Sequence, residues 1–185
     1  NLFMGIEGMA FLWQDNQKII HNGEFYRLIT SMFLHADFAH LFANCYGLIV
    51  FGTAIEYIYS DKECLIIYFI TGFIGNLPEL LINPYSISMG ASGAVFGFTG
   101  AVFLIIIVEN RNYIWLVLLY LVAAIIQSFA PGIGTWAHIF GLIAGLAYAR
   151  WRKPEYYHAF VKIVKKWYQD KKTKRQRRIN KTYYQ

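Results

Sequence analysis

Residues 90–97 of the chain read Gly90-Ala91-Ser92-Gly93-Ala94-Val95-Phe96-Gly97, which places one serine among glycines at the start of an apolar run. No charged residue occurs from Ser92 to Val108. A helix over these residues would be about 25 Å long at ~1.5 Å per residue, a little less than the ~30 Å hydrocarbon core of a bilayer. We therefore expect a membrane helix that holds its serine just below one membrane surface, where the hydroxyl needs a hydrogen-bonding partner.

Ser92 by itself has two interpretations. Gly93, Gly97 and Gly100 form a smooth face of the kind that lets membrane helices approach closely, and Ser92 can simply belong to that packing. The alternative is that Ser92 carries chemistry. Gly-x-Ser-Gly alone is too weak a motif to choose between them. The rest of the chain favours the second interpretation.

The composition indicates a single-domain integral membrane protein. Of the 185 residues, 57% are hydrophobic and only 15% are charged, which is too apolar for an ordinary soluble domain. Most Lys and Arg follow Ala149, so the net charge of +6 belongs mainly to the tail. A basic tail can bind nucleic acid, but after several spanning segments it is better explained as a cytoplasmic flank on anionic lipids. We therefore expect membrane lipids as partners, and no nucleic acid.

Five apolar segments are expected to span the membrane, which makes the fold an all-α polytopic bundle. They cover residues 40–59, 64–83, 92–108, 113–130 and 136–149. The chain then divides into a first loop with interfacial helices at residues 1–39, a transmembrane core at 40–150 and a basic tail at 151–185. Because it opens at Asn1 with neither an initial Met nor a signal peptide, we expect an earlier spanning helix to precede it.

The distribution of positive charge predicts the orientation. If the tail is cytoplasmic, alternation places the turns at residues 60–63 and 109–112 on the same side, and each contains a basic residue. The outer side then receives the first loop and two connections, at residues 84–90 and 131–135. This brings Ser92 and His138 near the same outer leaflet without any assumption about chemistry.

His138 lies near the start of the last apolar segment, and Gly141 and Gly145 form a second small face after it. Two glycine-faced helices can pack backbone to backbone, which would bring Ser92 and His138 within hydrogen-bonding reach. An ionisable residue in a spanning segment is costly and points to function, although a histidine bonded to a backbone carbonyl is the structural alternative. A histidine can take the proton of a serine nucleophile. Because neither segment contains Asp or Glu to orient the imidazole, the sequence predicts a dyad.

His40 and Asn44 are four residues apart and therefore share one helix face. Together with the Ser92 backbone N–H at a helix start, they would supply the donors that an oxyanion intermediate needs. The competing interpretation is a metal site formed by His35, Asp37 and His40, but that spacing matches no standard pattern. We expect neither a metal nor a cofactor.

In their order and spacing, these motifs resemble those of the rhomboid intramembrane serine proteases. The resemblance covers nearly all of residues 23–150. It rests on Gly23-Glu24-Phe25-Tyr26-Arg27, Thr30-Ser31-Met32-Phe33-Leu34-His35, His40-Leu41-Phe42-Ala43-Asn44, Gly90-Ala91-Ser92-Gly93, and Ala137-His138 with Gly141 and Gly145. Together these motifs are highly specific.

The resemblance implies roles for individual residues. Ser92 would be the nucleophile and His138 the base, while His40, Asn44 and the Ser92 amide would form the oxyanion hole. Phe96 matches the aromatic position that packs on the catalytic histidine. The remaining motif residues, Glu24, Arg27, His35, Gly90, Gly93, Gly141 and Gly145, would support the site. Residues 131–135 would form a cap over it, and the 113–130 helix a lateral gate.

The resemblance also implies an activity and a location. Rhomboids cleave other membrane proteins within or beside a transmembrane helix, and they prefer a small residue at the cut and a helix that unwinds readily. This chain would be a multi-pass plasma-membrane protein that takes transmembrane proteins as substrates, with its active site open to the outer side and its tail in the cytoplasm. Residues 155–169 would form a basic helix on the cytoplasmic leaflet.

The chain departs from the family pattern in two places. Tyr26-Arg27 stands where many members have Trp-Arg, a change that preserves interfacial anchoring. The five segments would be the second to sixth of the family's six-helix core, so the first helix is missing from this sequence.

Two rival classes fit the sequence less well. Non-catalytic rhomboid-like proteins that bind membrane clients lack the serine or the histidine, and this chain has both. A transporter is a weaker alternative, because the polar groups cluster at one leaflet.

Overall fold

The computed structural model describes residues 6–109, 111–128, 134–152 and 173. Internal contacts divide the chain into two units, Asn1–Lys153 and Pro154–Gln185. The helix expected at residues 155–169 lies outside the described residues, and so does most of the expected tail. The architecture below is that of the first unit.

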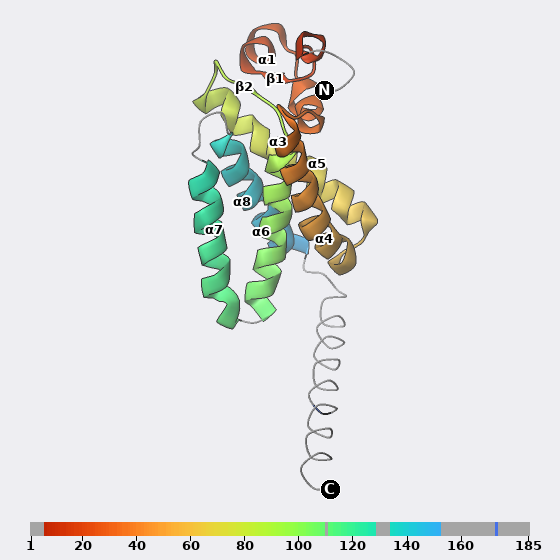
Figure 1. The fold of residues 1–185 in the computed structure, drawn as a ribbon, viewed down its shortest axis with the longest axis vertical. Helices are drawn as coiled ribbons and strands as arrows, with labels where there is room; N and C mark the ends of the chain where they lie inside the picture. The colour runs from red at the N-terminus through yellow and green to blue at the C-terminus, as the bar shows by residue number, and fades with distance from the viewer. Residues whose placement is uncertain (1–5, 110, 129–133, 153–172, 174–185) are drawn as a thin grey trace, which may run out of the picture. The chain divides into compact units, whose positions relative to one another are not determined.

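The described part of the first unit is almost entirely helical (Figure 1). Its elements are η1 (Ile6–Met9), β1 (Gln14–Asp15), α1 (Asn16–Asn22), α2 (Arg27–Thr30), η2 (Ser31–Phe33), α3 (Phe38–Gly47), η3 (Leu48–Gly52), α4 (Thr53–Ile58), α5 (Asp61–Ile82), β2 (Ile87–Ser88), α6 (Ser92–Glu109), η4 (Arg111–Tyr113), α7 (Ile114–Ser128) and α8 (Thr135–Arg152). The expected helical bundle is therefore confirmed. The sequence did not predict the short antiparallel pair of β1 and β2.

Two of the described helical spans are long and apolar enough to cross a membrane. These are Phe38–Ile58, which continues from α3 through the π-helical turn η3 into α4, and Asp61–Ile82, which is α5. Ser92–Val108 and Arg111–Ile126 are shorter apolar helices. By length and composition alone, then, two of the five expected crossings stand out.

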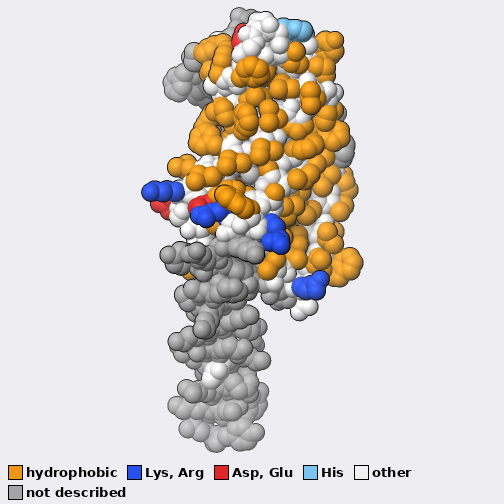
Figure 2. Space-filling view, turned by 180° about the vertical axis from the view of Figure 1, so that it is seen from behind, with side chains coloured by type: hydrophobic (Ala, Val, Ile, Leu, Met, Phe, Trp, Pro, Cys, Tyr) orange, Lys and Arg blue, Asp and Glu red, His pale blue; other side chains and the backbone are white. Residues whose placement is uncertain are grey.

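The surface of the bundle is strongly apolar. Figure 2 shows one face on which hydrophobic side chains cover a broad area, with Lys and Arg side chains gathered towards one end. The exposed large side chains include Phe42, Ile49, Leu65, Trp115 and Leu119. An apolar surface of this extent is unfavourable in water, whereas the hydrocarbon of a bilayer would match it because the backbone polar groups are bonded within the helices.

Helices α5, α6 and α8 form the centre of the bundle, and α6 packs most extensively on α8. Glycine makes this approach possible: a Cβ at Gly141 would collide with the carbonyl oxygen of Gly93, and a Cβ at Gly145 with that of Gly97. At Gly75 of α5 a Cβ would lie 2.7 Å from the Ala137 carbonyl oxygen of α8. The three backbones therefore meet without intervening side chains, which fixes the spacing between the ends of α6 and α8.

Arg27 holds the first loop together. Its side chain is only 2% exposed, and its Nε donates to Glu24 Oε2 at 2.6 Å. Its Nη1 donates to the carbonyl oxygens of Ala10 (2.8 Å) and Trp13 (2.9 Å). The hydrogen bond from Arg27 is the main cause that lowers the pKa of Glu24, so Glu24 stays ionised at neutral pH. Glu24 and Arg27 therefore stabilise the first loop. Strand β1 of this loop pairs with β2, which lies in the segment before Ser92.

We expect Arg27→Ala to lower the free energy of unfolding by about 2–4 kcal/mol, because two carbonyl groups lose a charged donor in a buried position. Thermal melting in detergent micelles, with limited proteolysis of residues 6–26, would measure the loss. Lys18→Ala is a matched control, since it removes a positive charge from an exposed position of α1. Equal melting temperatures for the two variants would contradict the anchoring role.

Candidate active site

Ser92 is the first residue of α6, and the chain reaches it through a turn that requires glycine. Gly90 has φ 134°, a conformation that side chains disfavour. A Cβ at Gly90 would also lie 2.8 Å from both Cε1 and Nε2 of His40. The Gly90 N–H donates to the Ser31 carbonyl oxygen at 3.0 Å, which ties the turn to the first loop. Gly90 therefore allows the backbone to pass close to His40 just before the serine.

The structure brings Ser92 and His138 together. His138 Nε2 lies 2.7 Å from Ser92 Oγ, across 46 residues of sequence. Phe96 lies one turn after Ser92 and stacks on the imidazole, with 4.3 Å between ring centroids and an interplanar angle of 9°. His138 is only 7% exposed. The ring is thus held in one plane with Nε2 directed at the hydroxyl.

A third residue, which the sequence analysis missed, bonds to the other nitrogen of this ring. Ser128 Oγ, in the last turn of α7, lies 2.6 Å from His138 Nδ1. The prediction of a dyad rested on the lack of Asp and Glu in the two segments that carry Ser92 and His138. A signal was present nonetheless, because Ser128 lies near the end of the preceding apolar segment, ten residues before the histidine.

The predicted oxyanion residues lie on α3. The His40 ring faces Gly90, as described above, and His35 packs against it edge-on with ring centroids 5.1 Å apart. The Asn44 side chain is buried, and its amide donates to the His40 carbonyl oxygen at 2.9 Å. One of the two Nδ2 protons of Asn44 is therefore directed back along its own helix. The contact that the structure shows with the serine turn comes from the His40 ring.

His35 lies in the loop before α3. Burial lowers its pKa, and the neighbouring His40 adds to the effect. The neutral form of His35 is therefore favoured at neutral pH.

The start of α6 contributes backbone donors. The Val95 N–H donates to the Ala91 carbonyl oxygen at 3.0 Å, in the i→i−4 pattern of a helix. Helix geometry leaves the earlier N–H groups, those of Ser92, Gly93 and Ala94, without an acceptor inside the helix. The positive end of the helix dipole lies here as well. A nucleophile–base pair next to such donors is suited to acyl transfer.

The residues that the structure describes contain no group of three or more His, Cys, Asp or Glu side chains that could hold a metal. The chemistry that this set of residues supports is proton transfer and nucleophilic attack. The absence of a metal or cofactor stays a prediction.

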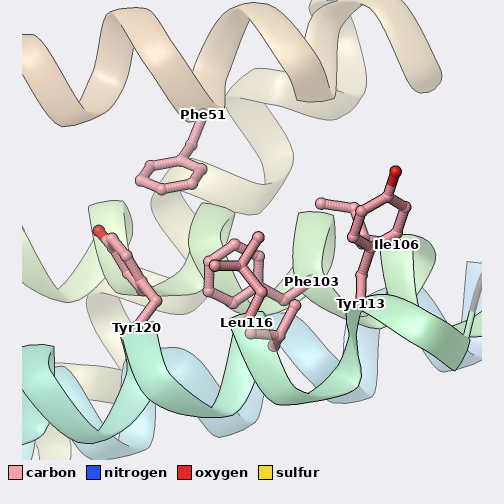
Figure 3. A pocket seen from close by; sticks show the side chains of 7 residues that line it. Phe51, Phe103, Ile106, Tyr113, Leu116 and Tyr120 are labelled. Atoms are coloured by element: carbon pink, nitrogen blue, oxygen red, sulfur yellow. The ribbon is translucent and has the colours of Figure 1, made fainter.

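An apolar pocket of about 510 Å³ lies away from these residues, between η3, α6 and α7. Its lining consists of Phe51, Phe103, Ile106, Tyr113, Leu116, Val117 and Tyr120 (Figure 3). Phe103 lies eleven residues beyond Ser92 on α6, a distance of about 16 Å along the axis. The pocket is therefore separate from the serine end of the bundle.

Comparison with known proteins shows which family the chain resembles. A family model described as the Rhomboid domain matches residues 22–154. The Bacillus subtilis protein YdcA, provisionally named a rhomboid protease, is 33% identical over 144 residues, or 72% of each chain. The rhomboid protease GluP of the same organism is 34% identical over 142 residues, which are 74% of this chain and 28% of GluP.

A plant protein gives a similar match. RHOMBOID-like protein 6, mitochondrial, from Arabidopsis thaliana is 34% identical over 137 residues, which are 71% of this chain and 45% of that protein. The chain thus spans most of YdcA but less than half of the other two relatives. A match of this extent confirms the family resemblance seen in the sequence motifs, and we conclude that the chain belongs to the rhomboid family of integral membrane proteins.

Proposed function

We propose that this chain is a serine endopeptidase that cleaves transmembrane helices of other membrane proteins. The observation that carries the proposal is the 2.7 Å approach of His138 Nε2 to Ser92 Oγ in a partly buried position. Family membership supports it, and GluP and YdcA carry protease names. As an alternative, a non-catalytic client-binding protein would have no need of a serine and a histidine in bonding contact.

In the acylation step, His138 Nε2 takes the proton of Ser92 as Oγ attacks the carbonyl carbon of the scissile peptide bond. The carbonyl oxygen becomes an oxyanion in the tetrahedral intermediate. When the intermediate collapses, the C–N bond breaks and His138 returns the proton to the leaving nitrogen. The product is an ester between Ser92 and the N-terminal fragment of the substrate.

In the deacylation step, a water molecule takes the place of the departed amine. His138 Nε2 removes one of its protons while the oxygen attacks the ester carbon. The second tetrahedral intermediate then releases the carboxylic acid, and the proton passes back to Ser92 Oγ. The enzyme is regenerated without net gain or loss of protons.

The oxyanion needs donors in both steps. The His40 ring lies beside the serine turn, and the first N–H groups of α6 precede the helical bond of Val95. We assign the oxyanion to these groups, with Asn44 as a further donor through its second Nδ2 proton. That assignment requires the Asn44 amide to reach Ser92 from the next turn of α3.

The position of the site in the bundle limits the substrate. Ser92 begins α6, so the reaction would take place near one membrane surface. The excess of basic residues in the tail favours a cytoplasmic tail and a site that opens to the outer side, and we propose the plasma membrane as the location. A helical substrate hides its carbonyl groups in i→i−4 hydrogen bonds, so the segment to be cut must unwind first. Small residues and helix breakers near that surface would favour cleavage.

Labelling with a fluorophosphonate probe, which reacts with activated serines, tests the proposal. We expect the detergent-solubilised full-length protein to be labelled at Ser92, and Ser92→Ala to abolish the label while its melting temperature stays the same. Ser60→Ala is the control, because Ser60 caps α5 and takes no part in the proposed chemistry.

A second assay would test the substrate class. The same preparation, placed in lipid vesicles with a single-span reporter protein, should release two fragments whose cut site mass spectrometry can locate. If a well-folded native protein shows neither labelling nor cleavage, the client-binding function gains the support instead.

A further inference from the structure

The imidazole of His138 is contacted on both of its nitrogens and on one face. Ser92 on α6 bonds to Nε2, Ser128 on α7 bonds to Nδ1 at 2.6 Å, and Phe96 covers the ring. Ser128 is only 2% exposed, so solvent does not compete for this bond.

The protons of these groups can be assigned from their partners. Ser128 Oγ also lies 2.9 Å from the Ala124 carbonyl oxygen, which can only accept a hydrogen bond. The single hydroxyl proton of Ser128 therefore goes to Ala124, which leaves Oγ as the acceptor for His138. His138 must then carry its proton on Nδ1, and its Nε2 is free to accept the proton of Ser92.

The opposite tautomer is disfavoured by the same set of groups. With the proton on Nε2, His138 would have to accept at Nδ1 from Ser128, and the Ser128 hydroxyl would lose its bond to Ala124. Nε2 would at the same time present a proton to Ser92 in place of a lone pair. A ring in that state cannot act as the base.

We propose that Ser128 is a positioning residue that holds His138 in the tautomer and orientation required for general-base catalysis. The inference rests on the proposed protease function, which it extends to α7. The Ser128 hydroxyl takes the place at Nδ1 that a carboxylate occupies in a catalytic triad. The site is therefore a serine–histidine–serine arrangement built from α6, α8 and α7.

A second bond fixes the position of Ser128 relative to the histidine. Thr135 Oγ1 donates to the Ser128 carbonyl oxygen at 2.5 Å, and Thr135 begins the helix that carries His138 three residues later. The end of α7 is thus bonded directly to the first turn of α8. This contact holds Ser128 beside the helix turn that carries the imidazole.

A hydroxyl differs from a carboxylate in one respect that limits the expected effect. Ser128 is neutral. It orients the ring and accepts a hydrogen bond from Nδ1–H, but it does not offset the charge of the imidazolium. The imidazolium that forms during the reaction would lose one hydrogen bond if the Ser128 hydroxyl were removed. Hydrogen bonds to charged groups are strong enough that we expect kcat to fall by about 10- to 100-fold. KM should stay the same, because Ser128 lies behind the ring and does not face the substrate.

The experiment compares Ser128→Ala with Ser128→Thr, which keeps the hydroxyl, in the vesicle cleavage assay. Thr99→Ala is the matched control, because Thr99 makes the same type of bond to its i−4 carbonyl (Val95, 2.9 Å) on α6 without touching His138. Ser128→Cys, which is nearly the size of serine and a weaker acceptor, serves if the added methyl of threonine prevents folding. The melting temperature is measured for each variant.

A readout independent of activity comes from nitrogen-15 NMR of the histidine side chains, with the His138 signal assigned by its loss in His138→Gln. The native protein should show the Nδ1–H tautomer at His138, and Ser128→Ala should show a mixture of both tautomers. This measurement does not require catalysis, so it tests the Ser128 contact even if the probe fails to label Ser92 and the protease function is abandoned.

The expected result is a 10- to 100-fold lower kcat for Ser128→Ala at unchanged KM, activity within a few-fold of native for Ser128→Thr, and no effect of Thr99→Ala. Native kcat in Ser128→Ala would overturn the proposal. The same holds if the tautomer of His138 does not change in that variant, or if the loss of activity only follows a loss of folded protein.

Discussion

Replacing His138 by alanine is expected to slow cleavage of a membrane-embedded substrate by about 10⁴- to 10⁶-fold, with the fold retained. Ser92 keeps its hydroxyl in this variant but loses His138, the base to which its Oγ is hydrogen-bonded among the described residues. A serine hydroxyl at its ordinary pKa is a poor nucleophile. Initial rates in vesicles, measured over hours for the variant, would give the ratio.

A double-mutant cycle tests whether Ser92 and His138 act together. Because Ser92 and His138 act in one proton transfer, the variants Ser92→Ala, His138→Ala and the double variant should all fall to the same residual rate. Lys62→Ala would be a useful control for general damage, since Lys62 lies at an exposed position of α5. Additive losses in the cycle would show that the two residues act independently and would contradict the dyad.

The second large effect is expected for Gly145→Ala. The new methyl group would collide with the carbonyl oxygen of Gly97, and a backbone atom cannot move aside as a side chain can. Helices α6 and α8 must then separate, at a cost of about 3 kcal/mol in the free energy of unfolding. A displacement of about 1 Å between the nucleophile and its base can reduce the rate by roughly 100-fold. Thermal melting and the cleavage rate should therefore fall together.

Ala147→Val provides the matched comparison, because it adds two methyl groups to the exposed side of the same helix. It should leave both the melting temperature and the rate close to native. If Gly145→Ala also melts and cleaves like the native protein, the close contact between α6 and α8 does not set the geometry of the site.

The placement of Ser92 against His138 could be predicted because its determinants are local. The glycines of 90–97, and the pair Gly141 and Gly145, mark faces on which backbones can touch, and the proximity of the two helices follows. Such faces are visible in a single sequence because glycine at four-residue spacing has few other uses in a membrane helix.

Other features of the structure have no comparable signal in the sequence. β1 and β2 are two residues long each, too short for an alternating pattern, and their pairing depends on where α5 ends. Ser128 is one serine among several, and only the contact between the end of α7 and the first turn of α8 brings its hydroxyl to the imidazole. The spacing of His40 and Asn44 predicts that they share a helix face, but it does not specify where the Asn44 amide points.

The pairing of β1 with β2 has a consequence for the order in which the protein folds. Gln14 pairs with Ser88, and the Asn16 side chain donates to the carbonyl oxygens of Glu79 and Asn83, so these contacts form only after α3, α4 and α5 have been synthesised. Contacts of such long sequence separation form late. Asn16 therefore lacks these partners until more than sixty further residues have been synthesised. Ser92 is fixed in its turn only afterwards, and His138 is synthesised later still. Under the proposed function, a nascent chain would therefore lack the assembled Ser92–His138 pair and could not cut neighbouring proteins.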